Sequence, residues 1–222
     1  MKITLRAVRK GSHDYERVQK LYRRSFPLSE RAPFQQLMHW ADGRRAQMYA
    51  LYDESAACAE ECGNGCGNRA EECGKGDNDS ASKRGGGCAG GHDGKWIGLA
   101  YFVRYRDVLY LFYLAIDENS QGKGYGSALL AAVRRHFAGR RVILNIEEVT
   151  DTAPNYEERI KRKRFYEKNG FHEMGYTVKE LGVVYEMLGM GETVTRKEYI
   201  ALMRSLIGRF GAWYIYHGQE KA

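Results

Sequence analysis

The chain has 222 residues, a formal charge of +7 and 43% hydrophobic residues. A chain of this length buries roughly 70% of its unfolded surface, so this composition suits one packed core and excludes a wholly disordered or collagen-like protein. No apolar run reaches the ~18 residues of a membrane helix, and the first residues lack an apolar signal segment. We therefore expect a cytoplasmic protein without a membrane partner.

The N-terminal part alternates strand and helix patterns. Val18, Leu21 and Tyr22 recur at helical spacing, which predicts an amphipathic helix around them. In chain order the predicted elements are a strand at Ile3–Val8, a helix at Asp14–Arg24, a short helix at Phe34–Trp40 and a strand at Gln47–Tyr52.

The segment from Asp53 to Lys95 differs from the rest of the chain. It contains no Val, Ile, Leu, Met, Phe, Tyr or Trp, and it holds all five cysteines. Such a segment buries too little apolar surface to offset the entropy of ordering it. We interpret residues 54–94 as a flexible Gly/Cys-rich loop inserted into a hairpin. The alternative is a metal site, because some cysteines follow one another with three residues between them, a spacing that zinc sites use. The paired C-x2-C steps typical of zinc sites are missing, so no metal ligand is assigned.

The elements after this segment complete a mixed α/β pattern. They are predicted strands at Trp96–Arg104 and Val108–Asp117, a helix at Ser127–Phe137, a strand at Val142–Ile146, a basic helix at Asn155–Lys168, strands at Phe171–Leu181 and Val183–Leu188, and a helix at Thr195–Ile207. The last helix opens with the capping box Thr195-x-x-Glu198. We expect a domain at residues 1–192, interrupted at 54–94, and a C-terminal helical extension at 193–222.

A glycine-rich turn between a strand and a helix is the most informative motif. It reads Gln121-Gly-Lys-Gly-Tyr-Gly126. Glycines allow close approach of a ligand to the backbone, and the free N–H groups of a first helical turn bind anions, so the turn predicts a phosphate or pyrophosphate site. The P-loop string is absent, and Ser127 stands where the dinucleotide fingerprint needs its third glycine. A turn that only packs helix against strand is the alternative.

A second motif, Arg164-Phe-Tyr-Glu-Lys-Asn-Gly-Phe171, closes the basic helix. Together the two motifs resemble the GNAT superfamily of acyl-CoA-dependent N-acetyltransferases, over roughly Ile3–Asp53 and Lys95–Leu188. The resemblance implies a mostly antiparallel, twisted mixed sheet flanked by helices. It implies acetyl-CoA as cosubstrate, with contacts from the strand residues Leu114, Ala115 and Ile116 and from the turn residues Gln121, Gly122, Lys123, Gly124, Tyr125, Gly126 and Ser127.

The resemblance also implies the chemistry. In the family, a substrate amine attacks the thioester directly, and the acyl group lies where the strand around Asn145 splays from its neighbour. Tyr166 takes the position of the tyrosine that protonates the departing thiolate. Glu147 and Glu148 follow this strand, and either could act as the general base, directly or through water. Strand alternation puts Glu147 on the same face as Asn145, so we expect Glu147 to be the base if Asn145 faces the cleft. Arg159 and Arg162 depart from the family pattern; they would meet CoA phosphates or form part of a solvated basic face.

The acceptor is expected to be a small-molecule or peptide amine. Tyr22, Phe26, Phe34, Trp40 and the stretch Ser29–Pro33 are predicted to line its side of the site, and a homodimer is possible. The alternative function is a non-catalytic module that binds CoA or, through the basic helix, nucleic acid. We expect no nucleic acid, because the basic residues lack interleaved aromatics.

Overall fold

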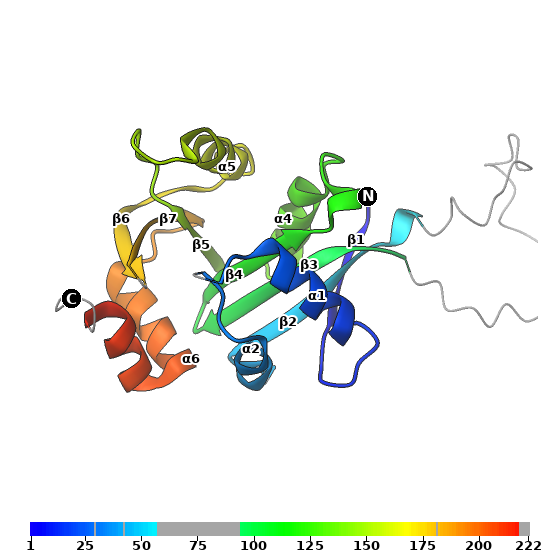
Figure 1. The fold of residues 1–222 in the computed structure, drawn as a ribbon, viewed down its shortest axis with the longest axis horizontal. Coiled ribbons are helices and arrows are strands. Elements are labelled where there is room, and N and C mark those ends of the chain that lie inside the picture. The colour runs from blue at the N-terminus through cyan, green and yellow to red at the C-terminus, as the bar shows by residue number, and fades with distance from the viewer. Residues whose placement is uncertain (29, 42, 57–93, 181, 218–222) are drawn as a thin grey trace, which may run out of the picture.

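The computed structural model describes residues 1–28, 30–41, 43–56, 94–180 and 182–217. The strands form one seven-stranded sheet in the order β1-β2-β3-β4-β5-β7-β6 (Figure 1). Every neighbouring pair is antiparallel except β4 and β5, which are parallel. The predicted fold class is confirmed. The strands are β1 (Ile3–Ala7), β2 (Ala46–Asp53), β3 (Lys95–Tyr105), β4 (Val108–Ile116), β5 (Arg141–Glu147), β6 (His172–Glu180) and β7 (Val183–Met190).

Helices cover both faces of the sheet (Figure 1). One apolar cluster joins α1, α2 and α6 to one face, and a second joins α4 and α5 to the other. The helices are α1 (Tyr15–Ser25), α2 (Phe34–Trp40), α4 (Tyr125–His136), α5 (Tyr156–Lys168) and α6 (Arg196–His217), with 3-10 turns η1 (Glu54–Ala56) and η2 (Glu118–Ser120). No helix in this part of the chain is long and apolar enough to cross a membrane.

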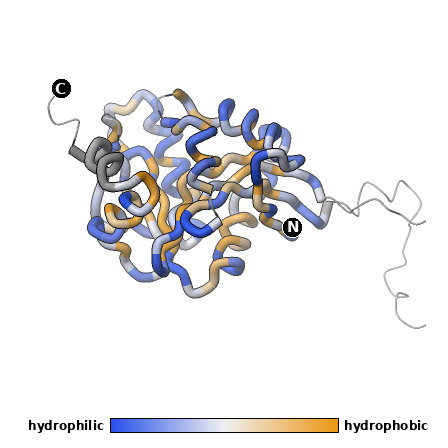
Figure 2. Tube along the Cα trace, turned by 90° about the horizontal axis from the view of Figure 1, so that it is seen from below, coloured by the Kyte–Doolittle hydropathy of each residue, from blue (hydrophilic) through white to orange (hydrophobic). Residues whose placement is uncertain are grey.

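Strand β3 shows how the sequence builds the two clusters. Leu99, Tyr101 and Val103 belong to the cluster under α1, α2 and α6, whereas Ala100 and Phe102 belong to the one under α4. Successive side chains of a strand point to opposite faces, so a continuous apolar run is what a strand covered on both sides requires. Figure 2 shows the hydrophobic residues gathered inside the molecule and the hydrophilic ones mostly outside.

The predicted hairpin across the unusual segment is confirmed at its two ends. Strands β2 and β3 pair antiparallel, and the pairing reaches Asp53 opposite Lys95. Residues 57–93, which contain all the cysteines, lie outside the described residues. The flexible-loop and metal-site interpretations of this insertion therefore stay predictions. Among the residues that the structure describes, no cluster of His, Cys, Asp or Glu could hold a metal ion.

Helix α6 begins with the predicted capping box. The Thr195 N–H donates to Glu198 Oε2 over 2.9 Å, and the Glu198 N–H donates to Thr195 Oγ1 over 3.3 Å. Tyr199, Leu202 and Met203 are fully buried against the sheet. At Gly208 the backbone leaves helical geometry, with φ 76° and ψ 170°. The first half of the predicted C-terminal extension is thus part of the core rather than an appendage to it.

Candidate active site

The parallel strands β4 and β5 separate partway along their length. They pair at Val108–Tyr110 opposite Arg141–Ile143 and no further. Beyond this point β4 continues to Ile116 paired only with β3, and β5 continues to Glu147 paired only with β7. The strand around Asn145 therefore splays from β4, as the resemblance implies.

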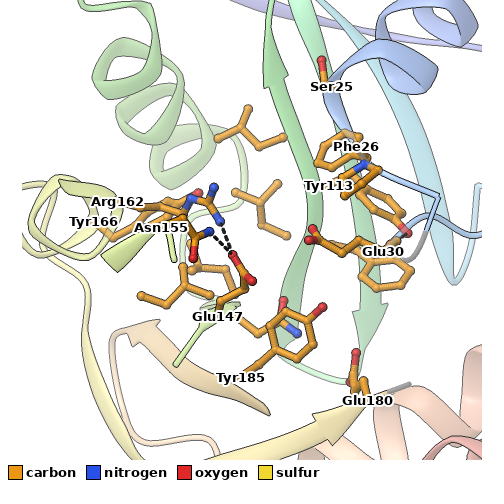
Figure 3. A pocket seen from close by; sticks show the side chains of 17 residues that line it. Ser25, Phe26, Glu30, Tyr113, Glu147, Asn155, Arg162, Tyr166, Glu180 and Tyr185 are labelled. Atoms are coloured by element: carbon orange, nitrogen blue, oxygen red, sulfur yellow. Dashed lines mark hydrogen bonds and ion pairs between the residues drawn. The ribbon is translucent and has the colours of Figure 1, made fainter. Parts of the chain in front are cut away.

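A cleft of about 340 Å³ occupies this opening. Its walls come from the end of α1 and the loop after it, from the diverging halves of β4 and β5, and from α5, β6 and β7 (Figure 3). The lining includes Ser25, Phe26, Pro27, Glu30, Leu111, Phe112, Tyr113, Leu114, Leu144, Asn145, Ile146, Glu147, Asn155, Arg162, Tyr166, Glu180 and Tyr185. Of the strand residues predicted to contact the cosubstrate, only Leu114 lines the cleft; Ala115 and Ile116 follow it on β4.

The glycine turn follows β4 and η2 and leads directly into α4. Gly122 and Gly124 have φ of 73° and 80°, and a Cβ at Gly122 would meet no atom within 4 Å, so backbone conformation rather than crowding requires these glycines. The Gln121 side chain donates to Ile116 O over 3.1 Å, and Lys123 Nζ donates to Asn119 O over 2.7 Å. The first bond fixes the turn to the end of β4, and the second joins it to η2.

The backbone of this turn is well suited to an anion. Within the described residues, the consecutive N–H groups of residues 122–127 donate to no acceptor, and α4 has no side-chain N-cap. Unpaired N–H groups at a helix N-terminus form an anion site because they combine hydrogen-bond donors with the positive end of the helix dipole. The turn residues predicted to bind the cosubstrate, among them Tyr125 and Ser127, therefore fit a pyrophosphate.

Gly126 has a different reason to be glycine. A Cβ there would lie 2.9 Å from the Phe165 ring. Since Phe165 belongs to the second motif, this contact joins the two motifs and packs α5 against α4. The next residue, Tyr166, is thereby placed beside the cleft.

Aromatic neighbours hold the Tyr166 ring, and its hydroxyl is available to a ligand. Its ring lies 5.1 Å from that of Phe165 and 5.6 Å from that of Phe171, centroid to centroid. Its hydroxyl makes no hydrogen bond to any other described residue. Burial raises the pKa of Tyr166, and the Arg162 charge lowers it to a smaller extent. The phenol therefore stays protonated at neutral pH, which is the form a proton donor needs.

Glu147 lies at the cleft, as predicted, but its carboxylate is already bound. Arg159 contacts Oε1 at 2.8 Å, Asn155 donates to Oε2 over 3.3 Å, and Arg162 lies 3.6 Å from Oε2. Arg159 also donates to Asn155 Oδ1 and to the carbonyl of Glu148. The arginines predicted to meet CoA phosphates or solvent thus serve a network around Glu147. The assignment of Glu147 as general base stays a prediction, and these contacts favour a structural role.

The loop before α2 brings Glu30, from the predicted stretch Ser29–Pro33, to the cleft, and β6 and β7 add Glu180 and Tyr185. Figure 3 shows Glu30 pointing into the cleft from one side, with Glu180 and Tyr185 at the lower end. Helix α6 supports Glu180, because the Tyr199 hydroxyl donates to its carboxylate. Burial, and after it the charges of Glu30, Glu180 and Glu147, raise the pKa of Tyr185. In the sequence, Glu30 is a candidate for attracting a cationic amine, with an ordinary helix-entry carboxylate as the alternative. Sequence reasoning misses Glu180 and Tyr185, because they lie on two C-terminal strands without a local motif.

The predicted acceptor-side aromatics only partly reach the cleft. Phe26 lines it, but Tyr22 and Phe34 are buried in the core cluster, and Trp40 packs against that cluster. The rings of Tyr22, Phe26, Phe34 and Tyr113 pack in edge-to-face and tilted contacts. Helical periodicity directs Tyr22 to the buried face of α1, so its ring packs in the core rather than lining the cleft. Ser29 lies outside the described residues.

Comparisons with known proteins agree with this geometry. Residues 87–173 match the family model described as Acetyltransferase (GNAT) domain. A GNAT-family protein of Bacteroides thetaiotaomicron, assigned as an acetyltransferase, superposes with a TM-score of 0.62 at 15% identity, over 95% of this chain and 98% of that one. A chimera of the spermidine N-acetyltransferase SpeG from Vibrio cholerae and hSSAT has a TM-score of 0.52 at 15% identity, over 86% and 95% of the two chains. No curated protein matches the sequence significantly.

Proposed function

Since the chain has the GNAT fold and its residues 87–173 match the GNAT acetyltransferase domain, we propose that it transfers an acetyl group from acetyl-CoA to a primary amine. The observation that carries this proposal is that the candidate anion site and the cleft lie on the same strand. The unpaired N–H groups of residues 122–127 follow the same strand, β4, whose free half forms one wall of the cleft. A molecule anchored by its pyrophosphate at the turn can therefore extend along β4 into the cleft.

The residues present fit acetyl-CoA. The turn N–H groups would hold the pyrophosphate, and Leu114 would lie beside the arm that carries the thioester. When bound, acetyl-CoA supplies the activated acetyl group. The unpaired edge of β4 beyond Tyr110 has backbone groups free to polarise the thioester carbonyl. A donor aimed at a developing oxyanion is typically worth about 3 kcal/mol of barrier.

Tyr166 would protonate the sulfur as the C–S bond breaks. Its hydroxyl is protonated at neutral pH and has no partner among the described residues that would compete for it. The rings of Phe165 and Phe171 fix its orientation. General acid catalysis from a positioned side chain contributes about 10²- to 10⁴-fold to a rate.

The acceptor end of the cleft would take a cationic amine. Carboxylates of Glu30, Glu147 and Glu180 line it together with the Arg162 guanidinium. Because Arg159 and Arg162 pair with Glu147, the negative charge that would attract the amine is that of Glu30 and Glu180. The amine would reach the thioester between β4 and β5 and attack it directly. No cysteine lies in the chain outside residues 58–88, which is consistent with transfer without a covalent enzyme intermediate.

The test is release of free thiol from acetyl-CoA. Propylamine, 1,4-diaminobutane and lysine amide are offered as acceptors, and thiol is followed with a chromogenic disulfide. We expect amine-dependent release with at least one acceptor, and a loss of about 10²-fold in kcat for Tyr166→Phe, which keeps the ring packing. Tyr156→Phe, at the first turn of α5, is the matched control. Absence of amine-dependent thiol release with all acceptors would contradict the proposed function.

A further inference from the structure

The loop between α1 and α2 is fixed to the sheet by one phenol. Tyr113 of β4 accepts a hydrogen bond from the Ala32 N–H over 3.1 Å and donates one to the Glu30 carbonyl over 3.0 Å. The Tyr22 hydroxyl donates to Ala32 O over 2.8 Å, and the Glu30 N–H donates to Pro27 O over 3.1 Å. The main chain on both sides of the Glu30 side chain is therefore held in place.

The Glu30 carboxylate points into the cleft, across from Glu147 (Figure 3). Within the part of the chain that the structure describes, Glu30 forms no ion pair, and its side-chain oxygens accept no hydrogen bond. Glu147, by contrast, has both oxygens engaged by Arg159, Arg162 and Asn155. A carboxylate bound by guanidinium groups must give up strong, charge-assisted hydrogen bonds before it can take a proton. Of these two carboxylates, Glu30 is the one that is free to do so.

We propose that Glu30, rather than Glu147, accepts the proton of the acceptor ammonium; this inference rests on the proposed acetyl transfer. The ammonium gives one proton to Glu30, and the neutral nitrogen attacks the thioester carbon. The C–N bond forms, the C–S bond breaks, and the sulfur takes a proton from Tyr166. The second nitrogen proton restores Tyr166, and Glu30 releases its proton to solvent. The sum is ammonium and acetyl-CoA giving amide, CoA thiol and one proton.

The electrostatic surroundings of Glu30 agree with this role. Burial raises its pKa, and the Glu147 charge raises it further, while Arg162 and Arg159 lower it to a smaller extent. A raised pKa makes a carboxylate a stronger base, provided that the pH stays above that pKa. The titratable and charged groups on the surrounding elements are Tyr113 of β4, Glu147 of β5, Arg159 and Arg162 of α5, Glu180 of β6 and Tyr185 of β7.

The experiment compares Glu30→Gln and Glu147→Gln by thiol release, with whichever of propylamine, 1,4-diaminobutane and lysine amide reacts fastest. Glu192→Gln, an exposed site between β7 and α6, is the matched control. We expect Glu30→Gln to lower kcat by about 10²-fold or more and to remove the fall in kcat/KM at acidic pH. Glu30→Asp keeps the fall at acidic pH with an intermediate kcat. Glu147→Gln also keeps it, and Glu192→Gln matches the natural chain.

Other outcomes would overturn the inference in distinguishable ways. If Glu30→Gln raises KM and leaves kcat unchanged, Glu30 only attracts the cation. If Glu147→Gln alone removes the acidic fall, Glu147 is the base. Melting with and without acetyl-CoA shows that each variant is folded and binds the cosubstrate. If the natural chain binds acetyl-CoA but acetylates none of the amines, the proposed function fails, and the role of Glu30 fails with it.

Discussion

The Tyr113 hydroxyl joins the loop that carries Glu30 to the sheet. Tyr113→Phe removes this hydroxyl and leaves the aromatic ring. The ring packing against Tyr22 and Phe26, at centroid distances of 5.0 and 4.8 Å, stays, whereas the interaction of the Tyr113 hydroxyl with the Tyr22 hydroxyl is lost with the oxygen. Two hydrogen bonds disappear. At about 1 kcal/mol net for each bond, the variant should lose about 2 kcal/mol of stability. For a chain of this length that is a fall in Tm of roughly 4–8 °C.

The same change should loosen the loop without removing any group from the chemistry. We expect kcat to fall about tenfold, less than for Glu30→Gln, and the Tm rise caused by acetyl-CoA to be retained. Melting curves and thiol release measure the two effects. Tyr105→Phe, half-buried at the end of β3, is the matched control. An unchanged Tm would refute the account of the loop, and a lower Tm with unchanged kcat would refute the link from Tyr113 to Glu30.

Three further substitutions test other contacts. Gly122→Ala, at φ 73°, should lower the free energy of unfolding by about 1–2 kcal/mol and weaken acetyl-CoA binding, because it disturbs the N–H groups of the turn. If titration calorimetry shows an unchanged affinity for acetyl-CoA, the result counts against the anion site. Gly126→Ala places a Cβ 2.9 Å from the Phe165 ring, so it should lower the free energy of unfolding by about 1–3 kcal/mol. The double variant Gly126→Ala/Phe165→Leu should recover part of that loss, because the smaller side chain makes room for the Cβ. Hydrogen bonds from Arg141 and Thr195 lower the pKa of Glu198 to about 2, so its stabilisation is complete above the unfolded value of ~4.3 and is lost as the pH falls through about 2. The Tm deficit of Glu198→Gln should therefore shrink between pH 7 and pH 2, and a deficit that does not change with pH would show that the ion pair contributes nothing.

The order and type of the elements could be predicted because their patterns are local. The capping box at Thr195 and the helix Phe34–Trp40 both depend on neighbours within a few residues, and the structure has them where the sequence places them. Some boundaries differ from the prediction. Helix α4, for example, begins at Tyr125, inside the glycine turn, rather than at Ser127. The packing partners of α6 could not be predicted, since they lie on strands far away in the sequence, such as β4, where Tyr110 contacts Tyr199.

The site could be predicted only where a motif is contiguous. The glycine turn and Tyr166 each belong to a string of residues with a recognisable spacing. The pairing of Glu147 with Arg159 and Arg162 joins a strand to a helix 12 or more residues later, and alternation alone does not show which carboxylate oxygens are already bound. The Glu30 carbonyl accepts a hydrogen bond from Tyr113, 83 residues away, so the contact that places Glu30 at the cleft appears only in the folded chain.

The central claim is that the turn at residues 122–127 and the opening between β4 and β5 bind acetyl-CoA. The most direct measurement is thermal melting of the purified chain with and without acetyl-CoA, with free adenine nucleotide as control. At 100 times its Kd a ligand adds about 2.7 kcal/mol, which for a chain of this size raises Tm by roughly 5–10 °C. We predict that rise with acetyl-CoA and little change with the nucleotide. No shift at saturating acetyl-CoA would contradict the account and leave the glycine turn as a packing feature between β4 and α4.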